Sequence, residues 1–211
     1  MSQHFPETLD EIAITCGADK ASSHPVRGHD YATPYEVTFG HLRWDKTKLL
    51  EVGVGGGESI RMWLEYFQAG HIYGCDIVSN TNPFNTHYPA GTPNPNPRYD
   101  FLQGDQSSKT HWACYLAFSG RDFDIIIDDG GHYSGQIINT FECLWLALRP
   151  GGFYCIEDLA AGSTTGTVFL TPGYPSHMDW LKGLTEKMNL GQNDIAEIHL
   201  WKELAIIHKK A

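Results

Sequence analysis

The sequence predicts a single α/β domain built on a mostly parallel sheet with an antiparallel pair at its edge. Four short apolar runs, rich in Ile, Val and aromatic residues, show no polar alternation, which is typical of parallel strands covered by helices on both faces. Helical stretches lie between these runs, as in right-handed βαβ units. The last segment alternates apolar and polar residues around a Lys-Glu pair and predicts an antiparallel hairpin. A length of 211 residues fits one such domain.

The elements follow from these patterns in chain order. Strands buried on both faces are expected at Lys48–Val52, His71–Cys75, Asp124–Ile127 and Phe153–Ile156. Helices are expected over Glu58–Gln68 and Gly135–Leu148, the second stopped by Arg149–Gly152, because Pro followed by paired Gly ends a helix. The hairpin strands are expected at Glu197–Trp201 and Leu204–His208. Two patternless stretches, Ser79–Pro97 and Ala160–Pro175, predict long loops that form the wall for an acceptor molecule.

Composition excludes several classes of protein. Twenty-five acidic and fifteen basic residues give a net charge of −10, which opposes phosphate backbones and anionic membranes, so neither nucleic acid nor a membrane is an expected partner. The first ten residues are polar and do not resemble a signal peptide, and apolar runs such as Leu144–Leu148 are too short to span a bilayer. Five cysteines lack a C-x-x-C pair, and three of them lie within apolar segments, which predicts buried thiols rather than bridges and a cytoplasmic location.

A glycine-rich segment, E-V-G-V-G-G-G-E at Glu51–Glu58, follows the first strand and opens the first helix. Glycines let the backbone turn sharply and approach a ligand, and the helix N-terminus offers free N–H groups, so the segment predicts a nucleotide-like ligand. The dinucleotide pattern G-x-G-x-x-G, started at Gly53, fails at Glu58, and no P-loop G-K-[ST] follows. Asp76 ends the second strand, where a carboxylate can bind ribose hydroxyls in both nicotinamide and adenosylmethionine binders.

These segments together resemble the class I S-adenosylmethionine-dependent methyltransferases. The glycine segment resembles their first motif, Asp76 the ribose-binding acid, and Gly104–Gln106 the segment that contacts adenine. Taken alone, Asp105 is equally well explained as a cap of the helix that starts near Ser107. The resemblance implies a Rossmann-like fold with a mostly parallel seven-stranded sheet and S-adenosyl-L-methionine as cofactor. The residues implied at the cofactor are Glu51, Gly53, Gly55, Asp76, Asp105, Gln106 and Asp128.

A second group of polar residues follows the strands expected at Asp124–Ile127 and Phe153–Ile156. Asp128–His132 reads D-D-G-G-H, and Glu157-Asp158 ends the next strand. Because the carboxyl ends of parallel strands meet at one edge of a sheet, four carboxylates and an imidazole should gather there. Carboxylates crowded together repel one another, and a hard divalent cation such as Mg²⁺, Ca²⁺ or Mn²⁺ relieves this repulsion. Taken singly, Asp128 or Asp158 could instead be a helix cap or a turn residue. His132, with an ordinary pKa of about 6.5, suits a general base.

The D-D-G-x-H element followed by I-E-D is similar to a narrower family, the metal-dependent O-methyltransferases of macrolide and other antibiotic sugars, with relatives known as cephalosporin hydroxylases. The match extends upstream to Gly17–Lys20, His29–Tyr31 and Tyr35-Glu36. It implies a segment 1–45 that caps a nucleotide-binding core of residues 46–211. The roles it implies are Mg²⁺ ligation by Asp129, Glu157 and Asp158, proton removal by His132, and contact with the cofactor's methionine end by Lys20 and Tyr31.

The resemblance therefore implies Mg²⁺-dependent transfer of a methyl group from S-adenosylmethionine to a hydroxyl of a small molecule, either a sugar or a glycosylated natural product. Three alternatives stay open: a nicotinamide-dependent oxidoreductase on the same sheet, a catechol-type O-methyltransferase acting on an aromatic diol, and a non-catalytic metal- or nucleotide-binding module. Members of the antibiotic-sugar family carry an additional N-terminal region used in assembly, so a homo-oligomer is also left open.

Overall fold

The structure, a computed structural model, describes residues 7–78, 96–162 and 169–211. Within these residues, seven strands form one sheet in the order β3-β2-β1-β4-β5-β7-β6. Strands β1 to β5 pair in parallel, whereas β7 pairs antiparallel with both β5 and β6. The predicted α/β fold with an antiparallel C-terminal hairpin is confirmed. The strands are β1 (Lys48–Val52), β2 (His71–Asp76), β3 (Tyr99–Gln103), β4 (Phe123–Asp128), β5 (Leu148–Ile156), β6 (Ile195–Trp201) and β7 (Leu204–Lys209).

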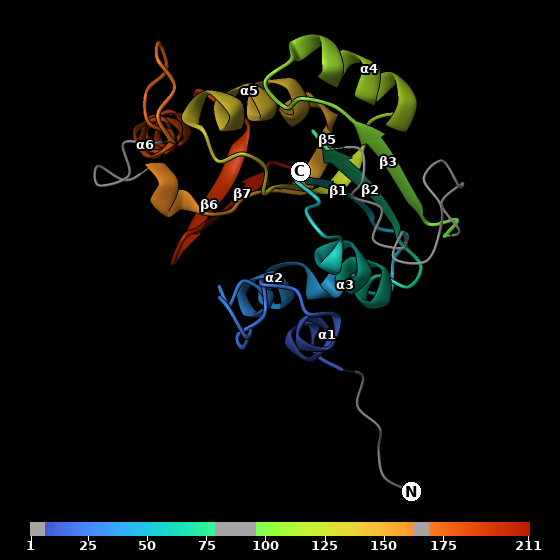
Figure 1. Cartoon of the computed structure of the whole chain (residues 1–211). Helices are drawn as coiled ribbons and strands as arrows, with labels where there is room; N and C mark the ends of the chain where they lie inside the picture. Colours follow the sequence, from blue (N-terminus) through green and yellow to red (C-terminus); the bar gives the residue numbers. More distant parts are fainter. Residues whose placement is uncertain (1–6, 79–95, 163–168) are drawn as a thin grey trace, which may run out of the picture.

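Helices cover both faces of the sheet, three on each side (Figure 1). One layer consists of α1 (Leu9–Cys16), α2 (Ala32–Phe39) and α3 (Glu58–Tyr66). The other layer consists of α4 (Lys109–Ser119), α5 (Ser134–Leu144) and α6 (His177–Asn189). Short 3₁₀ turns at Gly40–Leu42, Trp145–Ala147 and Leu159–Gly162 complete the described elements.

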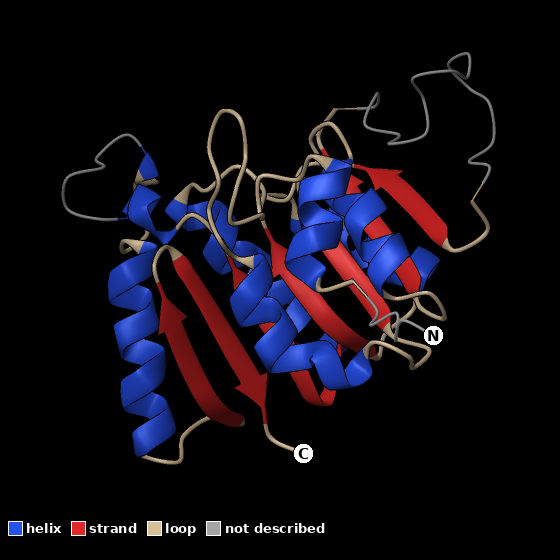
Figure 2. Ribbon diagram, turned by 90° about the horizontal axis from the view of Figure 1, so that it is seen from below, coloured by secondary structure: helices blue, strands red, loops and turns tan. Residues whose placement is uncertain are grey.

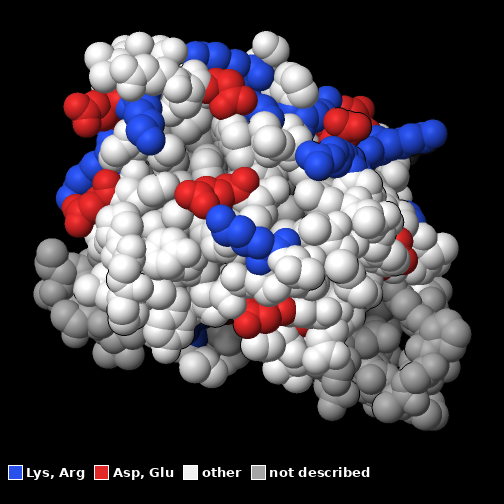
Figure 3. Space-filling view, turned by 90° about the horizontal axis from the view of Figure 1, so that it is seen from above, with Lys and Arg blue, Asp and Glu red and all other residues white. Residues whose placement is uncertain are grey.

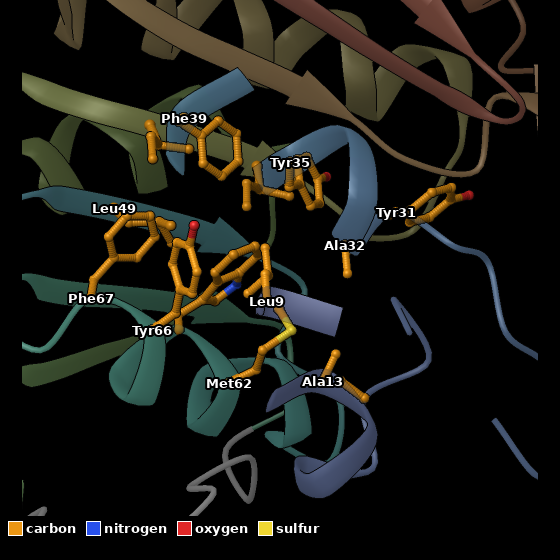
Figure 4. Close-up of a cluster of buried hydrophobic side chains, with 14 of the residues drawn as sticks. Leu9, Ala13, Tyr31, Ala32, Tyr35, Phe39, Leu49, Met62, Tyr66 and Phe67 are labelled. Atoms are coloured by element: carbon orange, nitrogen blue, oxygen red, sulfur yellow. The ribbon is translucent and has the colours of Figure 1, made fainter. Parts of the chain in front are cut away.

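The central strands are apolar at successive positions because each face of the sheet is covered. In β1, Leu49 packs into the layer of α1–α3, and Leu50 packs into the layer of α4–α6. The α1–α3 layer is rich in aromatic side chains: Phe39 from α2 approaches Phe67, just after α3, with ring centroids 6.3 Å apart (Figure 4). Alternate residues of a strand point to opposite faces, so burial of both faces removes any polar alternation.

After the first helix, the chain runs toward the carboxyl ends of the parallel strands. Thr8 and Glu11 form a capping box at the start of this helix, and Gly17 ends it in the left-handed conformation with φ of +74°. The segment that follows, residues 18–31, runs to the ends of the strands and carries Lys20 into the interior, where its side chain is buried. This N-terminal segment is therefore part of the site described below.

Three predicted boundaries are wrong in detail. The helix expected to reach Gln68 ends at Tyr66, and the helix expected over Gly135–Leu148 ends at Leu144. Arg149–Gly152, expected to separate helix from strand, lies inside β5. Between the pairs Phe123↔Leu148 and Ile125↔Phe153, the register of β5 shifts against β4, so this Pro-Gly-Gly stretch forms an irregularity that the strand absorbs.

The surface charges, the helix lengths and the state of the cysteines can be compared with the expectations from composition. On the face seen in Figure 3, the side of α4–α6, the acidic and basic side chains of the described residues are intermingled around a wide uncharged area. None of the described helices is long and apolar enough to cross a bilayer. All five cysteines are free, as predicted. Cys75 and Cys155 are buried, whereas Cys16 and Cys143 are half-buried and Cys114 is exposed.

Candidate active site

A cavity of about 590 Å³ opens at the carboxyl ends of the parallel strands, where the connecting loops gather along one edge of the sheet (Figure 2). Its wall is formed by the segments that follow β1, β2, β3, β4 and β5, together with parts of residues 17–24 from the N-terminal segment. This is the edge at which α/β sheets bind ligands, because loops from neighbouring strands diverge there.

The glycine loop after β1 forms one side of the cavity. Gly53 has a φ of +86°, and a Cβ atom on it would lie 2.0 Å from the carbonyl oxygen of Asp129. The loops after β1 and β4 can therefore approach this closely only if residue 53 is glycine. Gly57 precedes α3 without a side-chain cap, so the first N–H groups of that helix are left for a ligand.

Asp76, at the end of β2, holds this loop in place. Its Oδ2 accepts hydrogen bonds from the backbone N–H groups of Val54 at 2.9 Å and Gly55 at 3.1 Å, and the residue lines the cavity. Next to it, burial raises the pKa of the Cys75 thiol to about 12, with further contributions from Asp76 and two other acids, so the thiol is protonated and unreactive at neutral pH.

Gln106 and Asp128 support the paired glycines after β4. The side chain of Gln106 accepts from Gly131 N–H at 2.7 Å and donates to Oδ1 of Asp128 at 3.1 Å. A Cβ atom on Gly130 would lie 1.9 Å from Oε1 of Gln106, so this contact also requires glycine. Asp128 is buried and is not among the residues that line the cavity; burial raises its pKa to about 6, although the Gln106 hydrogen bond lowers it.

Asp105 lines the cavity but does not cap α4. Its Oδ1 accepts from the backbone N–H of Ser107 at 2.8 Å and from the hydroxyl of the same residue at 2.7 Å. The cap is Ser108, whose hydroxyl accepts from the N–H of His111 at 3.2 Å. The alternative explanation of Asp105 as the helix cap is therefore not what the structure shows.

Two acids and an imidazole form a cluster at the other end of the cavity. Ligand atoms of Asp129, His132 and Asp158 all lie within 4.8 Å of one another, and Nε2 of His132 is 3.4 Å from Oδ2 of Asp158. All three side chains are 22–24% exposed and line the cavity. His132 and Asp158 have φ of +59° and +53°, a conformation that non-glycine residues adopt at a cost and that is common at functional sites.

Behind this cluster, Lys20 sits among three carboxylates. Its Nζ is 2.5 Å from Oδ2 of Asp129, 2.8 Å from Oε2 of Glu157 and 3.5 Å from Oε1 of Glu51. Burial alone would lower the pKa of Lys20, but these carboxylates raise it well above its usual value, so the ammonium is charged. Tyr35 donates to the remaining oxygen of Glu157 at 2.6 Å. Both oxygens of Glu157 are thus bonded within the protein, on the side away from the cavity.

Tyr31 supports the cluster from another direction. Its hydroxyl donates to Oδ1 of Asp158 at 3.0 Å, and Nδ1 of His29 lies 3.5 Å from the same oxygen. Asp158 therefore presents Oδ1 to this aromatic pair and Oδ2 to His132.

The structure brings most of the predicted site residues to one cavity and places the others directly behind it. Five of the predicted site residues do not line the cavity and are held by partners within the protein. They are Glu51, Asp128, Lys20, Tyr31 and Glu157. Those that line it are Gly53, Gly55, Asp76, Asp105, Gln106, Asp129, His132 and Asp158. Sequence reasoning missed Asp19, His24 and Gln136 on the wall, and the role of Tyr35 behind it. The position of Gln136 in the wall could have been predicted from its spacing, because it lies four residues after His132, near the start of a helix.

Comparison with known proteins now assigns the family. Residues 50–159, just over half of the 211 residues, match the family described as Methyltransferase domain. The chain belongs to this methyltransferase domain family. The O-methyltransferase TomG from Streptomyces achromogenes shares the fold, with a TM-score of 0.56 at 14% identity. The predicted resemblance to class I methyltransferases is confirmed.

Within this methyltransferase family, the chain is similar to enzymes named for O-methylation of glycosylated compounds. It is 34% identical to the 8-demethyl-8-alpha-L-rhamnosyl tetracenomycin-C 2'-O-methyltransferase of Streptomyces olivaceus over 72% of this chain and 37% of that protein. It is 33% identical to the mycinamicin VI 2''-O-methyltransferase of Micromonospora griseorubida over 62% of this chain and 32% of that protein. The aligned part is therefore about a third of the length of these curated relatives.

A solved structure aligns with nearly all of this methyltransferase chain. MycE, a methyltransferase from the mycinamycin biosynthetic pathway solved with Mg and SAH, has a TM-score of 0.80 at 26% identity, covering 98% of this chain and 55% of that one. These relatives favour a methyltransferase over the nicotinamide-dependent oxidoreductase that the glycine loop alone left open.

Proposed function

We propose that this chain transfers a methyl group from S-adenosylmethionine to a hydroxyl of a sugar carried by a natural product. The observation that carries the proposal is a single cavity whose wall includes both the glycine loop and the cluster of Asp129, His132 and Asp158. The loop and the start of α3 suit the cofactor, and the cluster suits an acceptor that must lose a proton. The curated relatives, named for rhamnosyl and mycinamicin substrates, support a sugar as acceptor.

A hard divalent cation such as Mg²⁺ fits the acceptor end. Oxygens of Asp129 and Asp158 lie within 4.8 Å of each other and of a ring nitrogen of His132, and all three side chains line the cavity. Carboxylate oxygens are the ligands that such cations prefer. Asp129 and Asp158 would hold the cation. Glu157, whose oxygens are bonded to Lys20 and Tyr35, would reach it only by giving up its bond to Lys20.

The cofactor, the cation and the residues of the chain have different roles in the proposed reaction. When bound, S-adenosylmethionine supplies an electrophilic methyl group and the divalent cation a Lewis acid that favours ionisation of the acceptor hydroxyl. His132 takes the hydroxyl proton on Nε2, and Oδ2 of Asp158, 3.4 Å away, stabilises the resulting imidazolium. Tyr31 holds Oδ1 of Asp158 and so keeps that carboxylate turned toward His132.

The side-chain amide of Gln136 offers a further contact to the acceptor. Its Oε1 is buried and has no hydrogen-bond partner among the described residues, although the side chain belongs to the cavity wall. A buried polar atom without a partner is costly, so it is available to a donor on the ligand, such as a sugar hydroxyl.

A methylation assay tests the proposal. The purified protein is incubated with S-adenosylmethionine, Mg²⁺ and a panel of rhamnosides, glycosylated macrolides and catechols, and products are followed by mass spectrometry for the gain of one methyl group. We expect methylated glycosides, loss of turnover in EDTA and recovery with Mg²⁺ or Mn²⁺. Methylation of catechols alone would replace the sugar by an aromatic diol, and full turnover in EDTA would remove the cation.

The role of His132 has its own test. His132→Ala should keep binding of S-adenosylhomocysteine, measured by calorimetry, and lower kcat by roughly 10²–10⁴-fold, because it removes the group that accepts the proton. His71→Ala is the control. His71 is the first residue of β2, at the opposite end of that strand from the cavity residue Asp76, and it pairs with Asp100. Equal activity of the two variants would reassign the base to another group.

A further inference from the structure

A second hollow, which we call the lateral groove, lies between the chain entering α2 and the turn between β6 and β7. It is lined by residues 28–31, 33, 34, 37, 201 and 202 and has a volume of about 360 Å³. Small-molecule sites typically range from about 300 to 1,000 Å³, so the groove could hold a ligand of a few rings at most.

A single layer of side chains connects the lateral groove to the acidic cluster. Tyr31 and His29 line the groove, and both approach Oδ1 of Asp158, at 3.0 Å and 3.5 Å. Asp158 in turn lines the main cavity. The N–H of Leu159 donates to the carbonyl of Glu203 at 3.0 Å, which ties the β6–β7 turn to the end of β5. A ligand in the groove would therefore lie one side chain away from the proposed site of methyl transfer.

The lateral groove combines an aromatic surface with polar groups. Trp201 is 38% exposed, and Val37, which lines the groove from α2, is 78% exposed. The ring of His199, on the same strand, stacks on Trp201 with centroids 5.6 Å apart and an angle of 24°, which limits the motion of the indole. Asp30 lies in the groove with its Oδ1 accepting from the hydroxyl of Thr33 at 3.0 Å.

This combination matches the chemistry of a sugar. One face of a pyranose ring presents C–H groups that pack on an aromatic ring, and its edge presents hydroxyls that bind carboxylates and other polar groups. The indole of Trp201 offers the first kind of contact, and Asp30 and Lys202 offer the second.

We propose that the lateral groove is a carbohydrate subsite, which holds a pyranose ring of the acceptor other than the ring whose hydroxyl reacts. The inference rests on the proposed function, because it assigns the acceptor a second sugar. A second copy of this chain could also cover Trp201, but the polar lining and the link to Asp158 through Tyr31 favour a sugar.

Fluorine NMR tests the subsite without requiring turnover. Protein labelled with 5-fluorotryptophan carries six such residues, and the variants Trp201→Phe and Trp44→Phe assign two of the signals. Titration with methyl α-L-rhamnopyranoside and with the corresponding rhamnose disaccharide should shift the Trp201 signal. The signal of Trp44, which is 60% exposed outside the groove, should stay unchanged. Val37→Arg, which fills the groove from α2, should abolish the Trp201 shift.

Three results of the titration would overturn the subsite. They are a Trp201 signal that does not move, equal shifts of Trp201 and Trp44, and a Trp201 signal that depends on protein concentration, as expected if a second copy covers it.

Kinetics separates the subsite from the proposed function. Trp201→Ala should raise KM for a disaccharide-bearing acceptor about tenfold and leave kcat and the KM for S-adenosylmethionine unchanged. Trp44→Ala should change none of these constants. If the wild-type protein methylates glycosides and Trp201→Ala leaves every KM unchanged, the subsite is overturned and the function stands. If the wild-type protein methylates no glycoside, the function fails, and the NMR titration still decides the subsite.

Discussion

Lys20 brings one positive charge into a buried space that holds three carboxylates, so its removal would leave those acids without their shared partner. Lys20→Met should lower the free energy of unfolding by about 3–5 kcal/mol, the cost of breaking a buried ion pair. Lys109→Met is the control: Lys109 pairs with Glu142 at 3.7 Å with both side chains more than half exposed, and it should cost less than about 1 kcal/mol. Urea unfolding measures both, and similar small losses would contradict a buried network.

Glu51 gives the same network a dependence on pH. Burial raises its pKa to about 7 against an ordinary 4.5, although Lys20 and hydrogen bonds from Ser59 and Trp63 oppose the rise. The folded state therefore binds this proton more tightly than the unfolded chain, and its contribution to stability is lost as pH rises from 4.5 to 7. Relative to Glu51→Gln, the wild-type protein should lose up to about 3 kcal/mol across that window, measured by urea unfolding.

Glu11 provides a control of opposite sign. Hydrogen bonds from the backbone and the side chain of Thr8 lower its pKa, so its contribution is present above the unfolded-state pKa and is lost as pH falls. The wild-type protein should therefore gain stability relative to Glu11→Gln as pH rises. If the stability differences for Glu51→Gln and Glu11→Gln changed in the same direction with pH, the assigned pKa shifts would be wrong.

Single residues also show how far the sequence could predict the site. Gly53, Asp76, Asp129, His132 and Asp158 reach the cavity, as the ends of parallel strands require. The sequence could not separate Glu157 from Asp158, because both follow the same strand. Successive side chains leave a strand in opposite directions, and only the packed structure supplies Lys20 and Tyr35 as partners for Glu157.

At the scale of elements, the contact between the β1 and β4 loops can be tested with two glycines that share a conformation. Gly53→Ala places a Cβ atom 2.0 Å from the Asp129 carbonyl, whereas Gly173 has the same φ of +86° and nothing within 4 Å. Both substitutions carry the left-handed cost of about 1–2 kcal/mol. Gly53→Ala should cost clearly more and abolish S-adenosylhomocysteine binding in calorimetry, whereas Gly173→Ala should bind normally. Equal effects would mean that the two loops can move apart.

Strong local patterns predicted elements better than weak ones. The buried strands and the C-terminal hairpin were found because their apolar runs are dense, and only their ends differ in the structure. Helix α6 was missed although Met178, Leu181, Leu184 and Met188 recur at helical spacing and pack against the core. Arg149–Gly152 was expected to stop a helix before the strand begins, but Leu148 and Phe153 on either side of it both pair with β4, so the stretch lies inside β5. Most of Ser79–Pro97, and 163–168 of Ala160–Pro175, lie outside the described residues, so their acceptor role stays a prediction.

For the whole molecule, ligand linkage gives a test of the cofactor that does not depend on the acceptor. S-adenosylhomocysteine at 100 times its Kd should stabilise the fold by about 2.7 kcal/mol, which corresponds to an increase in Tm of roughly 5–10 °C for a chain of this size. NAD at the same concentration should leave Tm unchanged, because the glycine spacing lacks the third position of the dinucleotide pattern. Stabilisation by NAD and none by S-adenosylhomocysteine would contradict the methyltransferase function.

The position of Lys20 in the chain also affects the order of events during synthesis. Its two closest partners, Asp129 and Glu157, lie 109 and 137 residues further along. At a translation rate of about 5–20 residues per second, Lys20 leaves the ribosome roughly 7–27 s before Glu157. Lys20 cannot reach its full set of partners during that interval, because Glu51 has been made but Glu157 has not. The acidic end of the cavity is therefore completed late on the ribosome, after most of the sheet is available, although one of its key residues is among the first to emerge.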